Sequence, residues 1–110
     1  MLIDLAGGTI PTDKDGYLRN LEDWSEEVAV ELAHAENIQL TEHHWEIIYL
    51  LRDFYREFAL SPAMRALVKQ VSKKLGEDKG RSVYLLQLFP PSPARIATKI
   101  AGLPRPANCF

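Results

Sequence analysis

Apolar residues recur at spacings of three and four from Trp24 onward, which is the pattern of helices that bury one face. The first predicted helix begins after Asp23 or Ser25, because either side chain can cap free backbone N–H groups. It ends near Asn37. One face of this segment is apolar, at Val28, Leu32 and Ala35. The pattern therefore predicts a short amphipathic helix.

A second, longer helix is predicted from a cap at Thr41 to about Ala59. Its apolar residues recur with helical spacing at Trp45, Ile48, Leu51, Phe54, Tyr55 and Phe58. Further apolar residues lie on its other side, at Ile47 and Leu50. A helix that is apolar around much of its circumference is buried, so we expect this one to be central. Its aromatic residues, with Trp24, are typical of a core, although they could also line a ligand pocket.

The clearest helix signal is the segment "LSPAMRALVKQVSKKLG" at 60–76. Ser61 is the expected cap, Pro62 fits the first helical position, and Gly76 follows the last turn. The expected core stripe of this third helix consists of Met64, Leu67, Val68, Val71 and Leu75. The segment therefore predicts an amphipathic helix with a basic outer face.

Two shorter helices are predicted toward the C-terminus. The fourth covers about 80–88, and "PPSP" at 90–93 stops it. Its apolar residues are Val83, Tyr84, Leu86 and Leu88. Pro93 can open a fifth helix over 93–101, in which Ile96 and Ile100 face inward, and Gly102 ends it.

The two ends of the chain carry other signals. "LIDL" and "TIPT" around "AGG" predict a hairpin over 1–12 with Pro11 on an edge strand. Pro104 and Pro106 preclude a helix, so 102–110 should be an extended, exposed arm that spans about 30 Å at ~3.3 Å per residue. We expect one mainly α domain over 1–110: an orthogonal bundle of about five helices over 23–101, with a short N-terminal β-hairpin and the C-terminal arm.

Length and composition agree with one ordinary globular domain: 110 residues, of which 46% are hydrophobic and 25% charged. The longest apolar run, "IIYLL" at 47–51, is too short to cross a bilayer. The N-terminal "MLIDLAGG" lacks the basic and apolar regions of a signal peptide. We therefore expect a cytoplasmic protein with no membrane partner, in a compartment that keeps thiols reduced.

Charge is distributed unevenly along the chain. Residues 1–64 carry a net charge of −9, whereas residues 65–110 carry +7. This polarity indicates either solvated helix faces or a binding face for an acidic partner or a nucleic acid. The third and fourth helices could form a helix-turn-helix, but the latter offers only Arg81, Ser82 and Gln87 to read bases. We therefore expect no sequence-specific DNA binding.

The sequence contains no recognisable metal or nucleotide motif. The three histidines are His34, His43 and His44, and adjacent residues on a helix point about 100° apart, so the last two make a poor ligand pair. The glycines match no phosphate-binding loop. We expect neither a metal site nor a cofactor.

Cys109 is the only cysteine and stands next to the last residue. It cannot close an internal disulfide, and an accessible thiol becomes a nucleophile or sulfur carrier when positive charge favours its thiolate. Arg105, Lys99 and Arg95 precede it and could supply that charge or dock the arm. The alternative is an incidental cysteine on a frayed tail.

The chain resembles the TusE/DsrC family of sulfur-relay proteins, and is closest to its TusE branch. The resemblance lies in "TKIAGLPRPANCF" at 98–110, "LRDFYREFALSPAMRALVK" at 51–69, "GYLRNLEDWSEEVA" at 16–29 and "LTEHHWEII" at 40–48. It implies a helical bundle with an N-terminal hairpin. It also implies a sulfurtransferase in the sense of a carrier, with Cys109 as the catalytic residue that receives sulfane sulfur as a persulfide.

For TusE-like proteins the resemblance further implies a TusBCD-type donor complex and a tRNA 2-thiouridylase as acceptor, with the sulfur reaching 2-thiouridine at the tRNA wobble position. DsrC-like relatives instead serve beside a dissimilatory sulfite reductase and use two cysteines on the arm. Here Thr98 stands where the upstream cysteine would be, which favours simple relay. A non-covalent regulator that binds through the basic helices is the alternative of another class.

Overall fold

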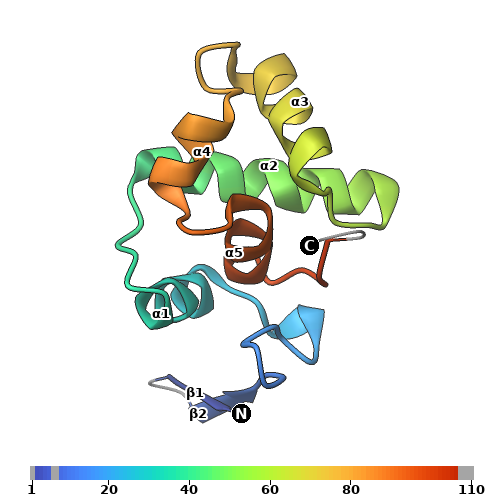
Figure 1. Cartoon of the computed structure of the whole chain (residues 1–110). Coiled ribbons are helices and arrows are strands. Elements are labelled where there is room, and N and C mark those ends of the chain that lie inside the picture. Colours follow the sequence, from blue (N-terminus) through green and yellow to red (C-terminus); the bar gives the residue numbers. More distant parts are fainter. Residues whose placement is uncertain (1, 6–7, 107–110) are drawn as a thin grey trace.

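A two-stranded hairpin precedes five α-helices that cross one another, as Figure 1 shows. The computed structural model describes residues 2–5 and 8–106. Its elements are β1 (Leu2–Leu5), β2 (Gly8–Pro11), the 3-10 helix η1 (Leu21–Asp23), α1 (Glu26–Ala35), α2 (Glu42–Phe58), α3 (Met64–Leu75), α4 (Ser82–Leu88) and α5 (Pro93–Ile100). The predicted mainly helical class is therefore confirmed.

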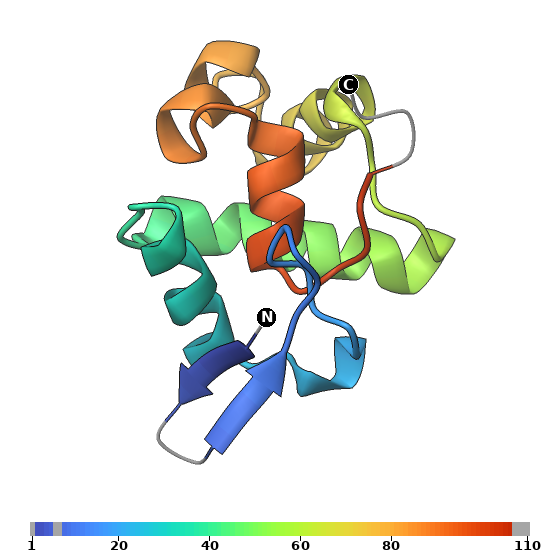
Figure 2. The ribbon, with the colours of Figure 1, turned by 60° about the horizontal axis from the view of Figure 1, so that its bottom comes forward.

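The strands β1 and β2 pair in antiparallel register, with Ile3 opposite Ile10 and Leu2 opposite Pro11. This confirms the predicted hairpin, although residues 6 and 7 of its turn lie outside the described residues. The side chains of Ile3 and Ile10 pack against the helical core, so the hairpin covers one end of the bundle near α1 (Figures 1 and 2).

The centre of the fold is α5, which contacts α1, α2, α3 and α4. Six of its eight residues are buried: Pro93, Ala94, Ile96, Ala97, Thr98 and Ile100. The expectation that the second helix would be the most buried is wrong, because α2 buries four of its 17 residues. The small side chains of Ala94 and Ala97 let other helices approach α5 closely, whereas the long α2 extends beyond the core at its C-terminal end (Figure 1).

The predicted helix starts at Ser25, Thr41 and Pro93 are confirmed, and the start at Ser61 and Pro62 is wrong. Ser25 caps α1, because its Oγ accepts the backbone N–H of Val28. Thr41 precedes α2 as predicted. Ser61 is not a cap, since α3 begins only at Met64 after Ala63. The Ser61 hydroxyl is used elsewhere and donates to the backbone oxygen of Pro104.

The four apolar residues predicted for the fourth helix divide between core and surface. Tyr84 and Leu88 pack against the core, whereas Val83 and Leu86 are exposed. Leu85 and Phe89, four residues apart, are completely buried. The pair Leu85 and Phe89 faces the core because α4 begins at Ser82 and lies against α5. The inward direction of Ile96 and Ile100 on α5 is confirmed. Among the described residues, no helix combines the length and the apolar character that a membrane span requires.

Candidate functional site at the base of the C-terminal arm

The candidate nucleophile Cys109 lies outside the described residues, so the site is built from the part of the arm that precedes it. After α5 the chain turns at Gly102 and passes beside the segment between α2 and α3 (Figure 2). Ala101, Gly102, Leu103 and Pro106 are buried, whereas Pro104 and Arg105 are exposed. The expectation of an arm exposed along its length is therefore wrong for Gly102, Leu103 and Pro106, and it is confirmed for Pro104 and Arg105.

The turn at Gly102 requires glycine for two reasons. Its φ of +74° lies in the left-handed region, and a Cβ at this position would collide with the ring of Trp24. Trp24 is held in place by a hydrogen bond of 2.9 Å from its Nε1 to the backbone oxygen of Ile100. The indole therefore supports the end of α5 and the turn that starts the arm.

Arg52 on α2 closes this turn from the other side. Its guanidinium lies 3.8 Å from the centre of the Trp24 ring, and its Nη1 donates a 2.6 Å hydrogen bond to the backbone oxygen of Ala101. A cation over an indole is attracted by the negative face of the ring. One arginine thus satisfies a carbonyl at the end of α5 and clamps the supporting tryptophan.

Two hydrogen bonds fix the next residues of the arm. The N–H of Leu103 donates to the backbone oxygen of Thr98 at 3.1 Å. The buried Ser61 donates through Oγ to the backbone oxygen of Pro104 at 2.6 Å. Because Leu103 and Pro106 are buried on either side of this bond, the arm lies against the body of the protein as far as Pro106.

Arg105 contacts the loop that follows the hairpin. Its Nη2 lies 2.9 Å from Oδ2 of Asp13 and 2.7 Å from Oδ2 of Asp15, and its guanidinium lies 4.7 Å from the centre of the Tyr17 ring. The hydrogen bonds from both carboxylates raise the pKa of Arg105. Burial acts to raise the pKa of Asp13, but the N–H groups of Asp15 and Tyr17 and the Arg105 guanidinium outweigh it and lower that pKa.

The other two basic residues predicted beside the thiol lie near the same tyrosine. Nζ of Lys99 is 3.3 Å from Oε2 of Glu36 and 5.6 Å from the centre of the Tyr17 ring. Arg95 is exposed, and its backbone oxygen accepts the Tyr17 hydroxyl at 3.2 Å. Arg105 and Lys99 therefore direct their charges toward N-terminal carboxylates. Their predicted effect on Cys109 remains a prediction.

These ion pairs connect the acidic N-terminal part of the chain with its basic C-terminal part. Three of the nine basic residues in the C-terminal part pair with acids of the N-terminal part: Arg105 as above, Lys99 with Glu36, and Lys79 with Glu46 at 2.8 Å. The two oppositely charged parts of the chain are thus partly neutralised within the fold. Among the described residues, the cations of α3 have no ion-pair partner: Arg65, Lys69, Lys73 and Lys74.

Sequence reasoning missed most of the residues that hold the arm. The sequence pattern predicts Trp24 in a core or a pocket and Ser61 as a helix cap, and it predicts no role for Arg52 or Asp13. The segment "TDKDG" at 12–16 has the composition of a turn, and in this turn Asp13 Oδ1 accepts the N–H of Asp15 at 2.8 Å. Apart from the hydrogen bond between Leu103 and Thr98, the arm-holding contacts join residues 43 to 92 positions apart, which no local pattern encodes.

His44 has a structural environment that explains its position. Its Nδ1 accepts the N–H of Thr41 at 3.0 Å, and its Nε2 donates to the backbone oxygen of Leu88 at 2.8 Å. His34 and His43 are exposed. Within the described part of the chain, no three histidine, cysteine, aspartate or glutamate residues are grouped as metal ligands would be.

Thr98, where the resemblance would place a second cysteine of DsrC-like proteins, lies inside α5. Its side chain is completely buried, and its Oγ1 has no hydrogen-bond partner. The position is therefore part of the core that supports the arm.

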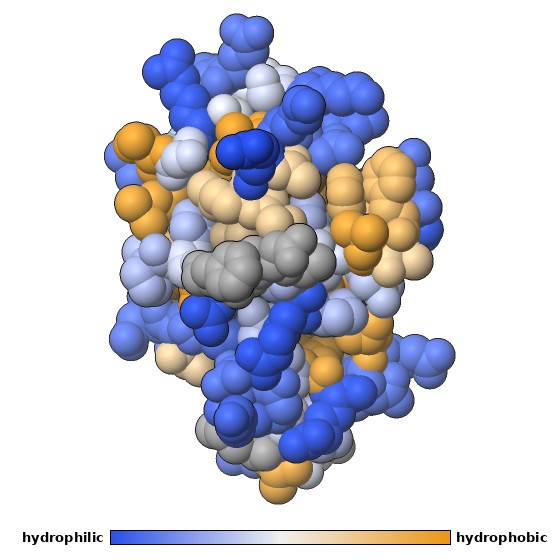
Figure 3. All heavy atoms as spheres, turned by 45° about the vertical axis from the view of Figure 1, so that its right-hand side comes forward, coloured by the Kyte–Doolittle hydropathy of each residue, from blue (hydrophilic) through white to orange (hydrophobic). Residues whose placement is uncertain are grey.

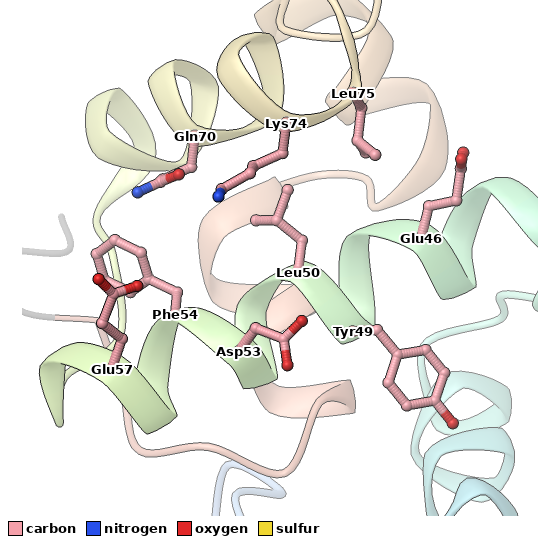
Figure 4. Close-up of a pocket in the computed structure, with 9 residues that line it drawn as sticks. All are labelled: Glu46, Tyr49, Leu50, Asp53, Phe54, Glu57, Gln70, Lys74 and Leu75. Atoms are coloured by element: carbon pink, nitrogen blue, oxygen red, sulfur yellow. The ribbon is translucent and has the colours of Figure 1, made fainter.

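A groove runs between α2 and α3 (Figure 4). It encloses about 290 Å³ and is lined by Glu46, Tyr49, Leu50, Asp53, Phe54, Glu57, Gln70, Lys74 and Leu75. Figure 4 shows the Phe54 ring turned toward α3 at the end of the groove. Its lining is apolar at the floor and carries charges of both signs at the rim.

Comparison with known proteins connects this architecture with sulfur chemistry. The family model described as "DsrC like protein" matches residues 4–110. Sulfurtransferase TusE of Escherichia coli (strain K12) is 53% identical over 110 residues, which cover 100% of both chains. Similarity to proteins of this name supports a role in sulfur transfer.

Two solved structures share the whole fold. The NMR structure of Allochromatium vinosum DsrC has a TM-score of 0.90 and 47% sequence identity, and covers 100% of both chains. The crystal structure of the oxidized gamma-subunit of the dissimilatory sulfite reductase from Archaeoglobus fulgidus has a TM-score of 0.86 and 38% identity, again over 100% of both chains. The fold predicted from the sequence is the fold of these proteins.

Proposed function

The chain belongs to the DsrC-like protein family, and on this premise we propose that it relays sulfur as a persulfide on Cys109. The observation that carries the proposal is the anchored arm, which delivers the last four residues of the chain from one fixed point beside Ser61 and Asp13. A thiol on such an arm can be presented to other proteins while the fold stays intact.

The chemical step is an exchange between sulfur atoms. The Cys109 thiolate attacks the outer sulfur of a donor persulfide, R–S–SH, and a new S–S bond forms as the donor S–S bond breaks. The donor leaves as the thiolate R–S⁻, and the outer sulfur keeps its proton in Cys109–S–SH. No external oxidant or reductant is consumed. Attack by an acceptor thiolate on the outer sulfur of Cys109–S–SH repeats the exchange and regenerates the Cys109 thiolate.

The partners in this proposal are a TusBCD-type donor complex and a tRNA 2-thiouridylase, with the sulfur destined for 2-thiouridine at the tRNA wobble position. The 53% identity to the E. coli sulfurtransferase TusE supports this assignment. The single cysteine supports it as well, because a chain with Thr98 in α5 has no second thiol to make a disulfide with Cys109.

Arg105 is proposed as a residue that positions the arm. Its guanidinium is shared between two carboxylates, which supports anchoring over stabilisation of the thiolate. Alkylation of Cys109 measured against pH tests this in Arg105→Ala. An unchanged apparent thiol pKa is expected, and a raised one would show that Arg105 acts on the thiolate directly.

Mass spectrometry tests the relay itself. The full chain is incubated with a low-molecular-weight persulfide, and we expect a gain of one sulfur atom at Cys109 that a reductant removes. Cys109→Ser should keep its helical circular dichroism and gain no sulfur. The relay would be ruled out if the wild-type chain gained no sulfur from the small persulfide and none from a TusBCD-type complex that is loaded with persulfide sulfur.

A DsrC-like role beside a dissimilatory sulfite reductase is the second candidate, favoured by the 38% identity to the gamma-subunit from Archaeoglobus fulgidus. It predicts co-purification of this chain with a sulfite reductase. Recovery of the tRNA 2-thiouridylase instead, in a pull-down on the immobilised full chain, would exclude this alternative.

A further inference from the structure

Two exposed apolar side chains stand next to the point where the arm is fixed. Phe58 ends α2 with 47% of its surface exposed, and Leu60 follows two residues later with 48%. The Phe58 ring packs on that of Phe54, with centres 4.6 Å apart. We call Phe54, Phe58 and Leu60 the arm-side patch.

The arm-side patch is tied to the arm through one residue. Ser61 follows Leu60 directly, and its hydroxyl donates to Pro104 of the arm. Figures 1 and 2 both show the arm running beside the segment that joins α2 to α3. Figure 3, in which the right-hand side of Figure 1 comes forward, shows apolar areas on this face between hydrophilic ones.

The length of chain beyond Pro106 limits where sulfur exchange can occur. Cys109 is three positions after Pro106, and three residues of extended chain span at most about 11 Å. A reacting sulfur of another protein must therefore approach to within roughly this distance of Pro106, plus the length of a cysteine side chain. A folded partner that comes so close must cover the surface beside the arm, and the arm-side patch is an exposed apolar area there, since Leu60 precedes the residue that binds Pro104.

From these observations we propose that the arm-side patch is the docking surface for a protein that presents a reactive cysteine to Cys109. The inference rests on the proposed relay. The end of α2 favours a protein over a nucleic acid as occupant, because its charges are mixed: Asp53 pairs with Arg56 at 2.8 Å, and Glu57 is acidic. Phe54 also lines the α2–α3 groove, so an apolar side chain of the partner can extend from the patch into that groove.

The same limit on distance has a consequence for the order of events. Donor and acceptor must each bring a sulfur atom to the same short segment, and each must cover the same surface. The two partners therefore exclude one another, and the carrier binds them in turn. A complex of donor, carrier and acceptor together is not expected.

A double variant, Phe58→Ser with Leu60→Ser, tests the docking surface. The matched control is Val83→Ser with Leu86→Ser on α4, where the side chains are 67% and 45% exposed and the arm is on the other side of the molecule (Figures 1 and 2). Three rates of sulfur transfer are measured: to the carrier from a small persulfide, to the carrier from a TusBCD-type complex that is loaded with persulfide sulfur, and from the carrier to the tRNA 2-thiouridylase. Light scattering reports the oligomeric state of each variant.

We expect the arm-side variant to load normally from the small persulfide and to lose at least about tenfold in both protein-dependent steps. The α4 control should retain all three rates of sulfur transfer. Because the two partners exclude one another, an excess of the acceptor should displace the donor from the wild-type carrier. If neither wild type nor any variant gained sulfur from the small persulfide, the relay itself would be contradicted. Equal protein-dependent rates in wild type and the arm-side variant, or a selective defect in the α4 control, would overturn the docking surface. So would a wild-type chain that is a dimer and an arm-side variant that is a monomer, because the patch would then bind a second copy of the chain.

Discussion

The hydroxyl of Ser61 donates a 2.6 Å hydrogen bond to the backbone oxygen of Pro104, across 43 positions of sequence. Ser61 lies between α2 and α3, and Pro104 lies in the arm that leads to Cys109. This bond makes the helical body a support for the last residues of the chain. The position of the arm is thus a property of the fold, whereas the arm sequence alone suggests only a stiff, exposed tail.

Replacement of Ser61 by alanine should loosen the arm without disturbing the helices. The lost hydrogen bond lowers the free energy of unfolding by about 1 kcal/mol. Hydrogen exchange at the N–H group of Leu103 should become faster, while exchange in α2 and α5 stays unchanged. Ser82→Ala, at an exposed position that begins α4, is the matched control. Equal exchange rates at Leu103 in wild type and Ser61→Ala would mean that the hydrogen bond does not hold the arm.

Replacement of Gly102 by alanine adds one methyl group and should strongly lower the free energy of unfolding. The left-handed φ costs about 1–2 kcal/mol for a non-glycine residue, and the new Cβ collides with the Trp24 ring. We expect a loss of more than 2 kcal/mol in urea unfolding, together with a shift of tryptophan fluorescence.

The matched control for this change is Gly8→Ala. Gly8 also has a positive φ, +137°, but a Cβ there would meet no atom within 4 Å. Gly8→Ala should therefore lower the free energy of unfolding only by the cost of a positive φ in a non-glycine residue, without a steric collision. If Gly102→Ala and Gly8→Ala cost the same, the packing of Trp24 on the turn is not what constrains Gly102.

The stability of the protein should fall as pH drops below about 6.5 because of His44. Burial lowers the pKa of His44 below its ordinary value of 6.5, which outweighs the hydrogen bond to the Leu88 oxygen that raises it; the nearby His43 lowers it further. The unfolded chain then binds a proton at a pH where the folded chain does not, so acid favours unfolding. This contribution is complete above pH 6.5 and is lost between that value and the lower pKa of the folded state.

Urea unfolding of wild type and His44→Gln at a series of pH values checks this prediction. The variant should be less stable at neutral pH, because it loses the contacts with Thr41 and Leu88, but its stability should depend less on pH across the window below 6.5. A slope in His44→Gln as steep as that of wild type would assign the effect to other groups.

The helices were predictable and the arm-holding site was not, for a physical reason. A helix is encoded by residues three and four apart and by caps such as Ser25, so the pattern of one segment is enough to find it. The site joins Trp24 to Ile100, Asp13 to Arg105 and Ser61 to Pro104, which are far apart in sequence. Ser61 shows the difference most clearly, because "SP" before an apolar stripe is a good helix-start signal, and the hydroxyl serves the arm instead.

The side chain of Thr98 tests whether a buried hydroxyl without a hydrogen-bond partner lowers the stability of the core beneath the arm. Its hydroxyl is buried without a hydrogen-bond partner, so it costs stability in the folded state and gains nothing in return. Thr98→Val keeps the branched shape and removes the unsatisfied group, and it should leave the free energy of unfolding unchanged or raise it by up to about 1 kcal/mol.

Thr12→Val provides the contrast, because Thr12 is also buried but donates through Oγ1 to the backbone oxygen of Asp13. That change should lower stability by about 1 kcal/mol. Urea unfolding of both variants gives the comparison directly. A clear loss of stability in Thr98→Val would mean that the hydroxyl is satisfied in solution. A gain would indicate that threonine is kept at this position for a reason other than stability, in the helix that carries the arm.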